Sequence, residues 1–114
     1  MSRVSLTVQQ IDRDASGLAA THTAPSSTEL SIPNNDGRIF LDVKNTGDTT
    51  QTVTVQTPGS VAGLDIEDLV ATVAPTTGDI MVGPFPPSVF NQSNGSVYVD
   101  LSATTTMTVG CFRL

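Results

Sequence analysis

Short runs in which apolar and polar residues alternate dominate this chain of 114 residues. Alternation with a period of two is typical of strands that bury one face. The clearest runs lie at residues 3–9, 38–44, 52–56, 97–101 and 107–114, and weaker ones lie at 28–32, 69–74 and 79–82. Together these runs predict about eight strands.

Turn-forming residues separate the runs. Asn45-Thr46-Gly47-Asp48 predicts a hairpin between two strands, because Asn and Gly accept positive φ. Residues 83–87 (GPFPP) predict a loop, because three prolines remove backbone donors. Residues 62–69 (AGLDIEDL) predict at most one short helical turn, with Leu64 as a candidate core contact. Residues 10–27 are small and polar without a period, so we expect a flexible arm or a long loop there.

The pattern predicts one domain, residues 1–114, because a chain of this length has no room for two. We expect an all-β fold: a single antiparallel β-sandwich, jelly-roll-like, with an extended N-terminal arm. An immunoglobulin-like sandwich is the alternative, although the Cys pair and the strand Trp typical of that fold are missing.

Composition narrows the classes of function. A net charge of −6 with five basic residues argues against nucleic-acid binding. With one Cys and one His, the chain can form neither an internal disulfide framework nor a structural zinc site. No run approaches the ~20 apolar residues of a membrane helix. We therefore expect no membrane partner. Residues 1–10 (MSRVSLTVQQ) lack the apolar run of a secretory signal, so we expect a protein made without export.

Candidate catalytic residues are few. His22 is the only histidine and lies in a polar stretch, so we interpret it as an exposed loop residue rather than as a general base. Cys111 lies within a strand and is interpreted as a small buried apolar residue. The acidic residues at 65–68 and 12–14 lack the spacing of a calcium loop and predict solvated turns. Phosphate-binding glycine motifs are absent, so we expect no catalytic residue, no metal and no cofactor.

The proline-rich segment carries the remaining signal. Phe85 and Phe90 are interpreted as a plug at the end of the core. The alternative is a contact surface for a partner, since a loop fixed by prolines loses little freedom on binding. The candidate partner-binding residues are Ile11, Leu18, Phe85, Pro86, Pro87, Phe90, Asn91 and Gln92.

Several segments then indicate a family. They are residues 35–45 (NDGRIFLDVKN), 52–59 (TVTVQTPG), 82–87 (VGPFPP), 90–92 (FNQ), 95–100 (GSVYVD) and 108–114 (TVGCFRL). These segments resemble small capsid decoration proteins (cement or minor head proteins) of tailed bacteriophages and prophages. The likeness spans nearly the whole chain and is loosest over residues 11–27, and its motifs are fold motifs rather than catalytic ones.

The resemblance implies a non-enzymatic, structural protein of the virion. It would bind the outside of the shell formed by the major capsid protein and stabilise that shell, often as a homotrimer. Two alternatives stay open. One is a head–tail or tail component of the same virion. The other is a jelly-roll module that binds carbohydrate or another surface, which predicts exposed aromatic residues, with Tyr98 as the only tyrosine. An enzyme is the third hypothesis and would need His22.

Overall fold

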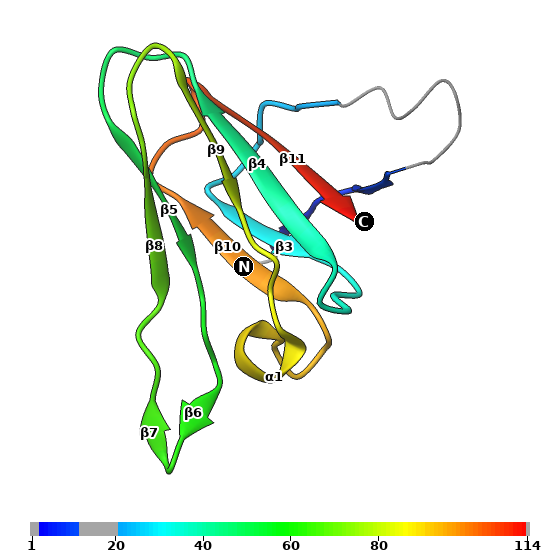
Figure 1. Ribbon diagram of the computed structural model, residues 1–114. Helices are drawn as coiled ribbons and strands as arrows, with labels where there is room; N and C mark the ends of the chain where they lie inside the picture. Colours follow the sequence, from blue (N-terminus) through cyan, green and yellow to red (C-terminus); the bar gives the residue numbers. More distant parts are fainter. Residues whose placement is uncertain (1–2, 12–20, 114) are drawn as a thin grey trace.

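The computed structural model describes residues 3–11 and 21–113 of the chain (Figure 1). Strands make up 47% of the described residues and helix 4%, which confirms the all-β prediction. The elements are β1 (Val4–Ser5), β2 (Val8–Gln10), β3 (Glu29–Ile32), β4 (Ile39–Asn45), β5 (Gln51–Val55), β6 (Ser60–Val61), β7 (Leu64–Asp65), β8 (Leu69–Val73), β9 (Gly78–Val82), α1 (Pro87–Phe90), β10 (Val97–Leu101) and β11 (Met107–Arg113).

Two sheets pack face to face. Within the described ranges, sheet A has the strand order β1-β3-β10-β5-β8 and sheet B the order β2-β11-β4-β9. Every second residue of the long strands points inward, so the fully buried core includes Leu30 and Val99 from sheet A and Leu41 and Val43 from sheet B. The predicted sandwich is therefore confirmed, and the alternating pattern is what builds it.

The connections follow a jelly roll. If the strands longer than two residues are numbered in chain order from β2 to β11, sheet B reads 1-8-3-6 and sheet A reads 2-7-4-5. That is the strand order of a jelly roll and differs from the immunoglobulin order. The sheets are nevertheless mixed rather than purely antiparallel, because β1 runs parallel to β3 and β2 runs parallel to β11.

The first alternating run forms two strands instead of one. Val4–Ser5 pairs with β3 in sheet A, whereas Val8–Gln10 pairs with β11 in sheet B. The chain crosses between the sheets at Leu6 and Thr7, and the Leu6 amide still donates to Ser31 O at 2.8 Å. This crossing keeps the alternation intact, so the pattern of the sequence alone does not reveal it.

The hairpin predicted at residues 45–48 is wrong. β4 belongs to sheet B and β5 to sheet A, so this connection passes from one sheet to the other. Asn45 is fully buried at the crossing, and its Nδ2 donates to Thr49 O at 2.8 Å. The Asn45 side chain thus stabilises a bend that connects the two sheets. This bend has the same residue types as a hairpin turn, so the two are not distinguished by the local sequence.

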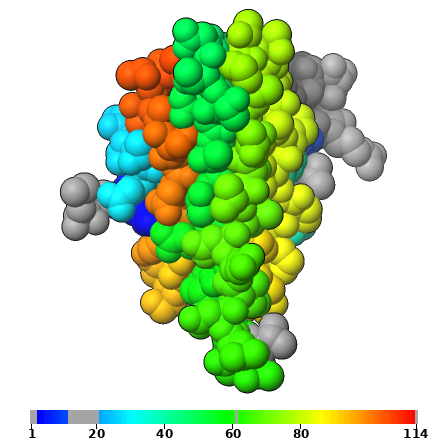
Figure 2. All heavy atoms as spheres, turned by 90° about the vertical axis from the view of Figure 1, so that its left-hand side faces the viewer, coloured from blue at the N-terminus to red at the C-terminus, as the bar shows by residue number. Residues whose placement is uncertain are grey.

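A hairpin does occur where a helical turn was expected. β6 and β7 pair across Ala62 and Gly63, which have φ of 53° and 79°. Leu64 is 72% exposed, so its interpretation as a core contact is wrong. The hairpin extends the β5–β8 ribbon and projects beyond the body of the sandwich (Figure 2). Among the described residues, no helix is long and apolar enough to cross a membrane.

Candidate functional site

One end of the sandwich brings together three segments that are distant in sequence. They are the turn at residues 34–37, the β6–β7 hairpin with its base (residues 57–68), and α1 with its flanking residues (85–92); we call this surface the hairpin end. In Figure 1 it forms the lower edge of the molecule. It contains six of the eight residues predicted to bind a partner, all from the proline-rich segment.

Asn35 holds the hairpin end together from inside. Its side chain is buried, and its Nδ2 donates to Phe85 O at 2.8 Å and to Asn91 Oδ1 at 2.6 Å. Its Oδ1 accepts from the Gly37 amide at 3.2 Å, which closes the turn. The sequence indicates a turn at this position, but the buried bridging role of Asn35 depends on residues 50 and 56 positions away.

Two glycines let the segments approach closely. A Cβ on Gly59 would lie 2.9 Å from Ser88 O, and the Gly59 amide donates to Val89 O at 3.2 Å. A Cβ on Gly37 would lie 3.3 Å from Pro87 Cδ. The helix is therefore packed between the hairpin base on one side and the turn on the other, and its backbone has little room to move.

Phe85 and Phe90 close the end of the core. Phe85 is fully buried, and its ring meets that of Phe90 edge-on with centroids 5.3 Å apart. The structure therefore agrees with the interpretation of Phe85 and Phe90 as a plug at the end of the core. Phe85 offers no side-chain surface to a partner, which corrects its place among the contact residues, while Phe90, Asn91 and Gln92 are half-buried. Pro86 and Pro87 remain exposed.

Ile11 reaches the same end by another route. It is 38% exposed, and its amide donates to Arg113 O at 2.8 Å. Arg113 in turn donates from Nη2 to Asn34 O at 3.0 Å and places Nε 3.4 Å from Asp36 Oδ2. Ile11 is therefore linked through one residue to the turn of the hairpin end. Leu18 lies outside the described residues.

The base of the projecting hairpin is fastened by Thr57. Its Oγ1 donates to Ile66 O at 2.9 Å, and its amide donates to Asp68 Oδ1 at 3.1 Å. Glu67 and Asp65 are exposed beside it. Throughout residues 3–11 and 21–113, no three His, Cys, Asp or Glu side chains are grouped so that they could hold a metal ion.

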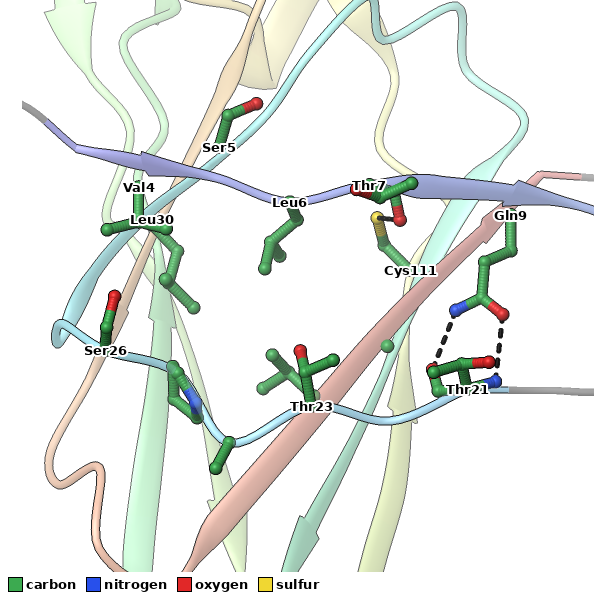
Figure 3. A pocket seen from close by; sticks show the side chains of 14 residues that line it. Val4, Ser5, Leu6, Thr7, Gln9, Thr21, Thr23, Ser26, Leu30 and Cys111 are labelled. Carbon is green, nitrogen blue, oxygen red and sulfur yellow. Dashed lines mark hydrogen bonds between the residues drawn. The ribbon is translucent and has the colours of Figure 1, made fainter.

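A second feature is a cavity of about 470 Å³ at the side of the sandwich where β1 and β2 lie (Figure 3). It lies between the N-terminal segment, which supplies Leu6 and Gln9, and residues 21–26, and none of its lining side chains is charged. Gln9 ties the two walls together: its Nε2 donates to Thr21 O at 2.7 Å, and its Oε1 accepts from the Thr21 amide at 2.9 Å.

Cys111 lies in the wall of this cavity. Its Sγ is 3.3 Å from Thr7 O, to which the thiol donates, and burial raises the pKa of the thiol to about 11. A nucleophilic cysteine needs the opposite, a pKa lowered by a positive neighbour. The geometry suits an apolar packing role.

His22 is not an exposed loop residue, which corrects the sequence interpretation. Its side chain is 16% exposed, and Nε2 lies 2.8 Å from Oδ2 of the buried Asp42. The ring also packs against Phe112 with centroids 5.9 Å apart. Thr23 next to it pairs with Val109, so residues 21–23 are fastened across β11. His22 holds a connecting segment onto sheet B.

A second carboxylate, Asp79, completes this cluster. Hydrogen bonding with the Asp42 carboxyl, and after it desolvation, raises the pKa of the exposed Asp79. Burial acts to raise the pKa of Asp42, but its hydrogen bonds with Asp79 and His22 lower that pKa overall. Among the described residues, the buried Asp42 Oδ1 has no hydrogen-bond partner, and a proton on Asp79 would supply Asp42 with a second donor beside His22.

Tyr98 bears on the carbohydrate-binding alternative. The Arg3 guanidinium lies over its ring, with Cζ 4.3 Å from the centroid, and donates to Asp100 Oδ1 at 2.7 Å. This face of the ring is therefore covered, and a sugar would have to displace a hydrogen-bonded arginine to stack on it.

The comparisons with known proteins add no relative. No family model, no curated protein and no solved structure matches this chain.

Proposed function

We propose that this protein is a non-catalytic structural protein of a tailed-phage virion that binds the outside of the major capsid shell and stabilises it. We infer the capsid shell as the partner from the resemblance of the sequence to decoration proteins. The observation that supports an adhesive role is the hairpin end, where exposed residues stand on a backbone already held in place.

The hairpin end favours binding because little freedom is lost there. Leu64 is 72% exposed at the tip, and Pro86 and Pro87 are exposed beside it. Asn35 fixes the helix and Thr57 fixes the hairpin base through hydrogen bonds of 2.6–3.1 Å. A surface that is ordered before binding avoids the cost of ordering side chains and loops, which is about 0.5–1.5 kcal/mol for each long side chain.

Stabilisation of a shell would follow from contacts that span neighbouring subunits. A copy that binds two subunits at once opposes their separation, and linkage makes the second contact effectively intramolecular. The contact of one copy can then be modest. Exposed carboxylates on the hairpin, Asp65 and Glu67, favour a partner surface that is basic around an apolar recess.

The test is quantitative mass spectrometry of purified particles of the source phage. The proposal predicts a ratio of this protein to the major capsid protein of the same order as one. A few copies per particle would place the protein at the neck or tail instead. Absence from the particles would overturn the structural proposal and bring the surface-binding module forward.

A further inference from the structure

Within residues 3–11 and 21–113, the sandwich has four sheet edges, and three of them are protected against pairing. β1 is only two residues long. β2 is short, and Thr23 pairs with Val109 beside it on the same side of β11. β9 carries Asp79 and ends before the Gly83–Pro84 bond. Shortness, coverage, charge and proline are the usual means by which sheet edges avoid pairing with other chains.

The fourth edge, β8, has none of these protections from the residues that the structure describes. It is the last strand of sheet A in the described part of the chain and spans five residues, Leu-Val-Ala-Thr-Val, without a charge or a proline. It is also where apolar side chains meet solvent. Of the large apolar residues that are exposed among those described, four lie between Leu64 and Met81, including Leu69 at 40% and Val70 at 58%.

We propose that β8 pairs antiparallel with β8 of a second copy of this chain, so that the two A sheets form one continuous sheet. The residues of β8 are complementary to those of a second β8 strand that runs antiparallel to it. In a two-fold pairing centred on Ala71, Leu69 lies opposite Val73 of the other copy and Val70 lies opposite Thr72. Apolar residues therefore face apolar residues or the Thr methyl group, and cross-strand pairs of this kind stabilise sheets.

The same register keeps the acidic residues apart. Asp68 and Glu67, which precede β8, lie opposite Ala74 and Pro75 of the other copy, so no like charges meet in a chain of net charge −6. A two-fold contact uses the same patch on both copies and closes at two. The resemblance to decoration proteins implies trimers, whereas this edge predicts a dimer.

The experiment is sedimentation equilibrium of the purified chain from low micromolar to millimolar concentration, without capsid shells. We expect a reversible monomer–dimer equilibrium, weak because the interface is small. The double variant Val70→Lys/Thr72→Lys places Lys opposite Lys twice, and both changed side chains point outward and are exposed. It should remain monomeric, with an unchanged circular dichroism spectrum. Met81→Lys is the matched control, since Met81 is 71% exposed on β9, and it should dimerise like the wild type.

A charge-swapped partner makes the register testable. Mixing Val70→Lys/Thr72→Lys with Val70→Glu/Thr72→Glu should restore a dimer that contains one copy of each, at least as tight as that of the wild type at low salt. A monomeric or trimeric wild type would overturn the proposal, and so would a double-lysine variant that dimerises. Shell binding is not measured, so failure here is distinct from failure of the proposed function.

Discussion

Asn35 and Asn91 are hydrogen-bonded to each other in both directions across the hairpin end. Asn35 Nδ2 donates to Asn91 Oδ1 at 2.6 Å, and Asn91 Nδ2 donates to Asn35 O at 3.2 Å. This pair joins the turn before β4 to the residue that ends α1. The order of the proposed adhesion surface therefore depends on two polar side chains rather than on apolar packing alone.

Replacing Asn35, the buried member of this pair, should lower the stability of the fold. Asn35→Ala removes the donors to Phe85 O and Asn91 Oδ1 and leaves both acceptors unpaired, so we expect a loss of about 1–3 kcal/mol in the free energy of unfolding. Urea denaturation measures it. A double-mutant cycle with Asn91→Ala supplies the control, because coupled residues lose less together than the sum of their separate losses. Strict additivity would show that the pair does not act as a unit.

The role of Phe85 as a plug gives a prediction that separates stability from binding. Phe85→Ala should cost about 3–5 kcal/mol of folding free energy, because it leaves a cavity under α1. Pro86→Ala, on the exposed neighbour, should cost less than about 1 kcal/mol. Thermal unfolding of both variants checks this, and equal losses would contradict the assignment of Phe85 to the core.

Gly110 allows residues 21–23 to lie against β11. A Cβ at this position would be 2.8 Å from Thr21 O, so Gly110→Ala should displace that segment and destabilise the fold by about 1–3 kcal/mol. The Thr23 amide, which donates to Val109 O at 2.9 Å, should then exchange its hydrogen faster. Thr108→Ala on the same strand is the control. Unchanged protection of Thr23 would argue against this contact.

The Cys111 thiol should report on opening of the cavity. Because burial raises its pKa to about 11, little thiolate exists at neutral pH, and thiolate is the reactive form. We expect a thiol reagent to label the native protein orders of magnitude more slowly than the urea-unfolded chain. Gln9→Ala, which frees Thr21 from the opposite wall, should speed native labelling. Labelling of the native wild type as fast as the unfolded chain would contradict the burial.

Alternation predicted most strands because it is a local property. Leu30 and Ile32, or Val97 and Val99, reach the core wherever their strand is paired, so their burial follows from the sequence. Partnership between strands does not. The crossing at Leu6 and the layer change at Asn45 leave the alternation unchanged. They depend on long-range pairing, of β1 with β3, of β2 with β11 and of β5 with β8.

The candidate site was less predictable for the same reason. Exposed prolines at residues 86 and 87 could be inferred from composition, but the bridging role of Asn35 and the pairing of His22 with Asp42 could not. Each joins residues at least twenty positions apart. The sequence of residues 62–69 is compatible with one helical turn as well as with a hairpin. The hairpin, in which Ala62 has a positive φ, forms because β5 and β8 pair on either side of it.

The Asp42–Asp79 pair predicts a stability that depends on pH with a definite sign. The pKa of Asp79 is raised, first by its hydrogen bond with Asp42, so a protonated Asp79 stabilises the fold, and this contribution is lost as the pH rises through the raised pKa. Lys44 and His22 act in the opposite direction, but the net shift is upward. The lowered pKa of Asp42 acts at lower pH, where stability is lost as that group protonates.

Asp79→Asn keeps a donor for Asp42 at every pH. The unfolding temperature of the variant should therefore rise relative to that of the wild type as the pH increases from acid toward 7, because ionisation of Asp79 weakens the wild type. Thermal unfolding at steps of pH measures this difference. Asp65→Asn removes the same charge from the exposed hairpin and controls for net charge. A difference that stays constant with pH, or that opens toward acid, would contradict a shared proton.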